Sequence, residues 1–262
     1  MKNALLWQLT PKNGGPVSYL FGTMHVRDLR AFAWLETAKS HLQQCATFAS
    51  EFDFSETDPM AIAAIMQLPE EESLDKLLKP GVWKNLEFYA RKKLGIPAEK
   101  LRLMHPMTVS LTLTNTLMAD GADYSLDETL WEHAQAIGIK TTGVETFAEQ
   151  LQTLKEIPFK QHVKSLTWLL KNYKRQKRRL KKMLKWYRNA NLASLYKAAK
   201  KDAKGMRNKL LFERNKIMAR RFAEIAHNES LFCAVGAGHL AGQKGMLRLL
   251  KKQGFKVRAV VA

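Results

Sequence analysis

Short apolar runs that prefer extended structure stand near both ends of the chain. Residues 4–9 and 17–22 are two such runs, and the stretch 11–16 between them contains Pro, Asn and Gly, which favour a turn. This pattern predicts a β-hairpin that ends on Gly22-Thr23-Met24-His25. Further strands are predicted where similar runs recur, at residues 45–52, 140–144, 231–235 and 255–261.

Most of the intervening chain follows the three-to-four-residue period of amphipathic helices. The pattern predicts helices over residues 31–44, 60–68, 126–137, 165–189, 213–225 and 244–252. Between residues 70 and 118 the helical pattern is interrupted at Pro80, Gly95 and Pro106, which predicts several short helices rather than one long helix. Ser125 and Glu128 have the spacing of a capping box at a helix start.

Strands at both ends with helices between them predict a mixed α/β fold. We expect a mixed β-sheet assembled from the N- and C-terminal strands and surrounded by many helices. A chain of 262 residues suits a single domain, 1–262, with a helical insertion at roughly 60–225. Hydrophobic residues make up 46% of the chain, which is enough apolar surface to exclude a disordered protein.

The sequence shows no sign of export or of membrane insertion. No apolar run approaches the roughly 18 residues of a spanning helix, or the roughly 7 of a signal-peptide core near the start. The chain as written is therefore expected to be cytoplasmic, or exported if an upstream signal has been removed. Two cysteines, Cys45 and Cys233, exclude a disulfide scaffold but leave one bridge open.

The charge is strongly positive and unevenly distributed. The formal net charge is +19, and residues 171–188 contain ten basic residues and no acidic one. A field of this sign attracts an anionic membrane surface or another polyanion. One hypothesis is therefore a binding module that acts through the basic helix 171–188. Nothing in the segment favours specific nucleic-acid binding, and the contrary interpretation is a solvated helix face.

A repeated phrase supplies the clearest candidate chemistry. A β-prone run, then Gly-x-x-His, then a helical segment occurs at Gly22 to His25 and again at Gly236 to His239. Glycine at a strand end permits a close approach to a ligand, and the histidine is then presented at the carboxyl edge of the sheet, where ligands bind in open α/β sheets.

Five phrases, in this order along nearly the whole chain, resemble the TraB/GumN family. They are Leu6-Trp7-Gln8-Leu9, Ser18-Tyr19-Leu20-Phe21-Gly22-Thr23-Met24-His25-Val26, Gly143-Val144-Glu145-Thr146, Glu213-Arg214-Asn215-Lys216 and Val235-Gly236-Ala237-Gly238-His239-Leu240, followed by Gly245-Met246-Leu247 and Gly254-Phe255-Lys256-Val257. The family is similar to the TIKI metalloproteases and, more distantly, to erythromycin esterases and ChaN-like haem-binding proteins. The chain departs from the family in lacking an export signal, in Met24 where Ile is commoner, and in its basic segment.

The resemblance implies a mixed α/β fold and, in the TIKI branch, a hydrolase that cleaves peptides with a divalent metal ion, here Mn, Co or Zn. It implies that His25, His239 and Glu51 are metal ligands. It also implies that Glu145 is the general base and that Arg214 stabilises an oxyanion or holds a carboxylate. Glu51 and Glu145 could exchange roles. The expected substrate is a peptide or a small molecule.

A further interpretation of the histidines stays open at this point. The same two histidines could bind haem or iron without catalysis, in which case the acid pair would not be needed. Asp127 is expected to be a helix-start residue rather than a ligand, and five histidines without the strand-glycine context are expected outside the site: His41, His105, His133, His162 and His227. Motifs of zincins, nucleotide-binding proteins and serine hydrolases are absent from the sequence.

Overall fold

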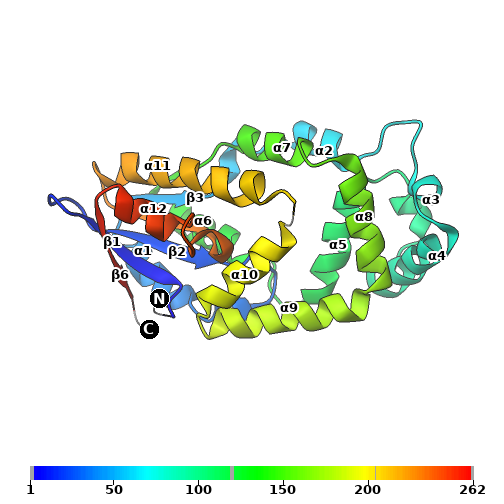
Figure 1. The fold of residues 1–262 in the computed structure, drawn as a ribbon, viewed down its shortest axis with the longest axis horizontal. Coiled ribbons are helices and arrows are strands. Elements are labelled where there is room, and N and C mark those ends of the chain that lie inside the picture. The colour runs from blue at the N-terminus through cyan, green and yellow to red at the C-terminus, as the bar shows by residue number, and fades with distance from the viewer. Residues whose placement is uncertain (1–2, 119–120, 204, 261–262) are drawn as a thin grey trace. The chain divides into compact units, whose positions relative to one another are not determined.

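The computed structural model describes residues 3–118, 121–203 and 205–260, which form two compact units (Figure 1). The first unit consists of the described residues of 1–56, 120–154 and 183–262. The second consists of those of 57–119 and 155–182. All strands of the sheet belong to the first unit, which also carries every residue predicted for the site.

The sheet of the first unit has six strands in the order β4-β3-β5-β2-β1-β6. The strands are β1 (Leu6–Pro11), β2 (Ser18–Thr23), β3 (Thr47–Ser50), β4 (Lys140–Gly143), β5 (Leu231–Gly236) and β6 (Phe255–Ala259). The hairpin predicted near the start is confirmed, because β1 pairs antiparallel with β2. The predicted mixed α/β fold is confirmed as well.

Four neighbouring strands of this sheet are parallel. β5 pairs in parallel with both β2 and β3, and β3 pairs in parallel with β4, whereas β1 is antiparallel to β2 and β6. The carboxyl ends of β4, β3, β5 and β2 therefore meet along one edge. Segments that lie far apart in the chain deliver their next residues to this edge.

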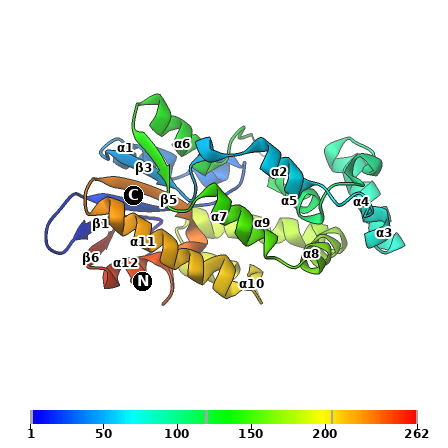
Figure 2. The same ribbon diagram turned by 90° about the horizontal axis from the view of Figure 1, so that it is seen from above.

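Helices cover both faces of the sheet. The helices of the first unit are α1 (Leu35–Leu42), α6 (Leu126–Ala136), α7 (Phe147–Lys155), α10 (Leu192–Asp202), α11 (Arg214–Ala226) and α12 (Met246–Lys252), α7 ending at the unit boundary. Figure 2 shows α1 and α6 on one side of the sheet and α11 and α12 on the other. The core between them includes the fully buried rings of Phe21, Phe48 and Phe232.

Short helices make up the second unit. They are α2 (Pro59–Met66), α3 (Leu74–Leu77), α4 (Pro80–Tyr89), α5 (Pro106–Met118), α8 (Phe159–Lys171) and the first part of α9 (Tyr173–Arg188). The predicted breaks are confirmed. Helices α4 and α5 begin at Pro80 and Pro106, where a missing N–H costs nothing, and a π-helical turn after α4 ends at Gly95, whose φ is 68°.

The prediction of a single helix over residues 165–189 is wrong, because the helix is interrupted at Asn172, where α8 ends and α9 begins. The Trp168 carbonyl accepts from both the backbone N–H and the side-chain amide of Asn172, each at 2.9 Å, so the side chain adds a second local bond at the end of α8. The backbone carbonyl of Asn172 then accepts from the N–H of Gln176 at 2.8 Å as α9 starts. Periodicity does not reveal the break, since the apolar stripe continues across it.

The helix predicted over residues 31–44 is also divided. A 3-10 turn at Leu29–Phe32 precedes α1, which begins only at Leu35. Asp28 caps the start of that turn. Its carboxylate accepts from the backbone N–H of Arg30 at 3.0 Å and also binds the Arg30 side chain. The local side-chain contact thus competes successfully with continuous helix.

Helix α9 contacts the first Gly-x-x-His loop through its apolar stripe. The fully buried Tyr187 donates its hydroxyl proton to the carbonyl of Gly22 at 2.9 Å. Both cysteines, Cys45 and Cys233, are buried free thiols, so the bridge left open by the sequence does not form. Within the described ranges no helix is both long and apolar enough to cross a membrane.

Candidate functional site

The predicted site residues follow the carboxyl ends of the four parallel strands. Glu145 comes two residues after β4, Glu51 directly after β3, His239 after β5 and His25 two residues after β2. Because the strands are neighbours in that order, the sheet brings together residues that are up to 214 positions apart in the chain. Arg214 reaches the same place from the first residue of α11.

Glu51 lies at the centre of the group. Its Oε1 accepts from the backbone N–H of Gly236 at 2.8 Å and lies 3.5 Å from His25 Nε2 and 3.8 Å from His239 Nε2. Its Oε2 accepts from Arg214 at 2.6 Å. Burial alone would raise the pKa of Glu51, but Arg214 and the two imidazoles hold it well below the ordinary value. Glu51 is therefore ionised.

Arg214 joins the two predicted carboxylates. Its Nε donates to both oxygens of Glu145 at 3.0 Å, and its terminal nitrogen donates to Glu145 Oε2 and Glu51 Oε2 at 2.6 Å each. Burial raises the pKa of Glu145, and the charge of Glu51 adds to that effect, while Arg214 opposes it. One guanidinium thus binds two buried carboxylates. The pKa of Glu51 is lowered, whereas that of Glu145 is raised.

Gln150, in the first turns of α7, also faces this pair. Its side-chain amide donates to Glu51 Oε2 at 3.3 Å and to Glu145 Oε2 at 3.5 Å. Helix α7 is itself started by a second capping box, in which Thr146 and Glu149 exchange hydrogen bonds of 2.7 and 3.1 Å. The sequence analysis missed Gln150, whose only signal is its position one turn into the helix after Glu145.

His239 is oriented by a neutral acceptor. Its Nδ1 lies 2.6 Å from Asn215 Oδ1, and the amide of Asn215 donates to the carbonyl of Lys244 at 2.7 Å. Because the Lys244 contact makes Oδ1 the atom that faces the imidazole, Nδ1 of His239 carries the proton and Nε2 keeps its lone pair. Burial lowers the pKa of His239 to about 4, so the ring is neutral at neutral pH.

His25 is oriented by a charged acceptor. Its Nδ1 lies 2.8 Å from Asp127 Oδ2, and Asp127 Oδ1 accepts a hydrogen bond from the Thr23 hydroxyl. The side chain of His25 is 57% exposed, whereas that of Asp127 is 3% exposed. The charge of Asp127 raises the pKa of His25 well above its ordinary value, with a smaller contribution from Glu51.

Asp127 therefore does more than the sequence predicted. It is the second residue of α6, and the predicted capping box of Ser125 and Glu128 is confirmed just before it. That cap fixes the first turn of α6 and directs the Asp127 side chain at His25. An acid within a capping box was the only signal in the sequence, and its partner is 102 residues away in the chain.

Substitution of Asp127 by asparagine is expected to change the protonation of His25. In the parent the raised pKa favours the imidazolium, with a proton on each nitrogen. If the asparagine oxygen keeps the Thr23 hydroxyl, its amide N–H faces His25 Nδ1, which must then lose its proton and leave the neutral ring protonated on Nε2. Nitrogen-15 NMR of the imidazoles in metal-free protein measures this directly. His239 in the same spectrum is the internal control, and an unchanged His25 signal would refute the orienting role of Asp127.

Two glycines at this edge lie close to other groups, and at Gly143 a side chain would collide with the backbone. A Cβ on Gly236 would lie 3.2 Å from Glu51 Oε1 and 3.4 Å from His25 Nε2, so the space before these atoms is open only because residue 236 has no side chain. A Cβ on Gly143 would lie 2.7 Å from the backbone nitrogen of Asp53 and 2.4 Å from the Glu145 carbonyl. Backbone atoms cannot move aside as a flexible side chain can.

No group of three or more His, Cys, Asp or Glu side chains in the described ranges is arranged as a metal site. Instead, Arg214 and the Gly236 N–H hold the oxygens of Glu51. The five other histidines contact different surroundings. His105 and His162 pack on each other in the second unit, and His41, His133 and His227 contact Tyr19, Gln43 and Phe255 respectively.

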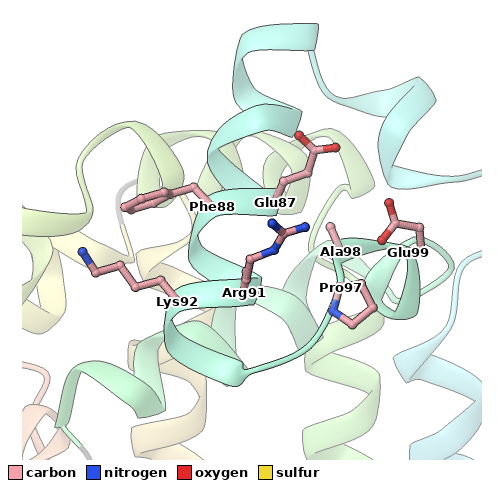
Figure 3. A pocket seen from close by; sticks show the side chains of 7 residues that line it. All are labelled: Glu87, Phe88, Arg91, Lys92, Pro97, Ala98 and Glu99. Carbon is pink, nitrogen blue, oxygen red and sulfur yellow. The ribbon is translucent and has the colours of Figure 1, made fainter.

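A hollow of about 420 Å³ on the second unit contains none of the predicted site residues (Figure 3). It lies beside the π-helical turn that follows α4, and its lining residues are Glu87, Phe88, Arg91, Lys92, Pro97, Ala98 and Glu99. The Lys92 ammonium lies 5.1 Å from the centre of the Phe88 ring. Carboxylates and cations alternate around the hollow, so its charge favours no single ligand class.

The curated proteins to which this chain is similar are named metalloproteases. Metalloprotease TIKI2 of Danio rerio is 24% identical over an alignment of 315 positions that covers 97% of this chain and 60% of the relative. Metalloprotease TIKI1 of Xenopus tropicalis is 23% identical, with 97% of this chain and 61% of the relative covered. The chain thus spans about three fifths of the length of these relatives.

A shorter match of higher identity is found with the metalloprotease TIKI homolog of Nematostella vectensis, which is 40% identical over 57 residues, or 21% of this chain and 12% of the relative. No solved structure matches the chain. The model of the TraB/PrgY/gumN family matches residues 5–259, which is nearly the whole chain. The protein therefore belongs to the TraB/PrgY/gumN family.

Proposed function

We propose that this protein is a metal-dependent hydrolase that acts as a peptidase. One observation carries the proposal: the Nε2 atoms of His25 and His239 lie 3.5 and 3.8 Å from the same oxygen of Glu51. Two imidazoles and one carboxylate are the donor set of many hydrolytic metal centres. The metalloprotease names of the similar TIKI proteins support the proposal.

The chemistry of these donors fits a divalent ion such as Mn, Co or Zn. Each histidine is held through Nδ1, by Asp127 or by Asn215, so that its Nε2 is the nitrogen directed at Glu51. Metal-binding histidines are commonly held in this way by a second acceptor. The missing Cβ of Gly236 leaves space before the same atoms. His25, His239 and Glu51 would hold the ion.

When bound, the ion supplies a Lewis acid that polarises the substrate carbonyl and lowers the pKa of an attacking water. The chain's own contribution is proton transfer and positioning. Glu145 is not one of the three proposed metal ligands. It would accept a proton at one of its carboxylate oxygens and return it to the leaving amine. Arg214 holds Glu145 in place with a two-pronged contact and keeps Glu51 ionised.

Substitution of Glu145 by glutamine tests this division of roles. The amide preserves the shape of the side chain but cannot accept a proton, so hydrolysis of a quenched-fluorescent peptide mixture should fall by about 100- to 10,000-fold. Bound metal, measured by elemental analysis, should stay at the parent level. Glu149→Gln is the matched control, because Glu149 lies in the same helix start and contacts Arg221 rather than Arg214.

Loss of metal from the Glu145→Gln variant would instead make Glu145 a ligand and Glu51 the base. The haem-binding alternative is tested on the same samples, since a Soret band in the absorption spectrum of haem-supplemented protein would support it. The geometry supports the hydrolase more strongly. A carboxylate oxygen lies within 4 Å of both Nε2 atoms, and such a set of nitrogen and oxygen donors would suit a divalent ion.

A further inference from the structure

A long stretch of the chain contains no acidic residue. Between Glu156 and Asp202 there are fifteen lysines and arginines and not one aspartate or glutamate. Protein surfaces usually intersperse both signs, because like charges repel one another. The stretch covers α8, α9 and most of α10, and the structure shows which of its side chains reach solvent.

Helix α8 presents an exposed stripe that combines lysines with a tryptophan. Lys160, Lys164, Trp168 and Lys171 recur at the three-to-four-residue spacing that places side chains on one helix face, and all four are exposed. Trp168 is 41% exposed, whereas the other five tryptophans, all within the described ranges, are buried or partly buried. The buried residues of α8 are His162, Leu166, Leu169 and Leu170.

The indole of Trp168 has neither a hydrogen bond nor a ring contact within the part of the chain that the structure describes. An exposed tryptophan with a lysine one turn before it and another one turn after it combines an amphipathic ring with positive charge. Such a ring is favoured where an apolar phase meets water, at the headgroup level of a bilayer.

Helix α9 adds a denser row of charge. Lys174, Arg178, Lys181 and Lys185 follow one another at intervals of three and four residues, and all are exposed. None of these four has an ion-pair partner in the described ranges. The other face of α9 is buried through Tyr173, Leu180, Leu184 and Tyr187, so the apolar side of the helix is not available to a ligand. Any partner therefore meets the cationic side.

We propose that α8 and α9 form a docking surface for an anionic lipid bilayer. A bilayer with anionic headgroups offers a dense layer of negative charge and an interfacial region that accepts an indole. Duplex nucleic acid offers the charge but no such place for Trp168. The exposed row on α9 consists of Lys and Arg alone, without the amides that read base edges. Charge and the exposed ring together favour the lipid surface.

The experiment compares sedimentation with vesicles of phosphatidylcholine, with and without phosphatidylglycerol. The parent should bind only the anionic vesicles. A variant with Glu in place of Lys174, Arg178, Lys181 and Lys185 should bind them at least about 100-fold more weakly, since each base near such a surface contributes several-fold. The matched control has Glu at four exposed lysines elsewhere, Lys12, Lys79, Lys93 and Lys252, and should retain most of the binding despite the same net charge.

Variants of Trp168 provide an independent test of the proposal. Trp168→Ala should weaken vesicle binding about tenfold, while Trp168→Phe should weaken it less, because a phenyl ring retains apolar contact with the interface. If the fourfold α9 variant and the matched control lost vesicle binding equally, only net charge would matter and the proposal would be overturned. It would also be overturned if the parent bound duplex DNA more tightly than anionic vesicles with no effect of Trp168→Ala.

Discussion

Substitution of Arg214 by methionine is expected to lower the free energy of unfolding by about 3 to 5 kcal/mol at pH 7, the largest stability effect that we predict. The reason is the pair of carboxylates that the guanidinium holds. The side chains of Glu51 and Glu145 are 10% and 2% exposed, and methionine would leave Glu145 without a cation and Glu51 with His25 as its cationic neighbour. Denaturant unfolding of the variant and the parent measures the difference.

Arg220 in the same helix provides the matched control. It pairs with Glu224 one turn later, and both side chains are more than half exposed, so Arg220→Met should change the stability by less than about 0.5 kcal/mol. Adding Glu51→Gln and Glu145→Gln to Arg214→Met should restore part of the loss, because no charge then stays buried. Equal effects of Arg214→Met and Arg220→Met would refute the buried network as a source of stability.

The pH dependence separates the parent from the variant. In the parent the pKa of Glu51 is depressed, so its contribution to stability is present above the unfolded value of 4.5 and is lost as the pH falls toward the folded pKa. Without Arg214, buried Glu51 and Glu145 would favour their protonated forms. The Arg214→Met variant should therefore gain stability relative to the parent as the pH is lowered from 7 to about 5.

Substitution of either His25 or His239 by alanine is expected to abolish stoichiometric metal binding, with a loss of affinity greater than about 100-fold. Loss of a residue that merely orients a metal ligand already costs up to about that much, and each alanine removes a proposed ligand itself. Calorimetric titration with Zn²⁺ or Mn²⁺, supported by elemental analysis, measures the effect. Full metal occupancy in either variant would refute the ligand assignment.

Both variants should also lose stability. His25 is half exposed, but its removal leaves the buried Asp127 oxygen without its donor, so His25→Ala should lose about 1 to 3 kcal/mol. His239→Ala should lose about 1 to 3 kcal/mol, because it leaves the buried Asn215 oxygen without its donor. His133→Ala, which alters a histidine in contact with Gln43, is the control for both measurements and should bind metal as the parent does.

Local signals were sufficient for many elements. The turn residues between 11 and 16 and the β-prone runs beside them predicted the hairpin, and Pro80, Gly95 and Pro106 predicted the helix breaks. These signals act within a few residues, because turn chemistry, capping and proline sterics need no tertiary partner. The same is true of the Ser125 and Glu128 capping box, which formed as predicted.

Predictions that depended on longer range were incomplete. The helix break at Asn172 is accompanied by a local bond from its side-chain amide to a helix carbonyl, and an unbroken apolar stripe conceals it. Gly143 bears no sequence mark of its own, yet the backbone of Asp53 passes so close to it that any side chain would collide. Such requirements arise only when distant segments pack together.

The sequence by itself determined the strand-ending glycines, the histidines that follow them and the acids that belong to the candidate site, because each is set by the residue types next to a strand end. Only the tertiary structure decided how they combine. Parallel pairing of β2, β3, β4 and β5 placed His25, Glu51, His239 and Glu145 at one edge. The roles of Asp127 and Asn215 as partners of the histidines required the fold, and so did the finding that Arg214, expected to hold a carboxylate, contacts both Glu51 and Glu145. A hydrogen bond acts over about 3 Å of space and is independent of separation along the chain.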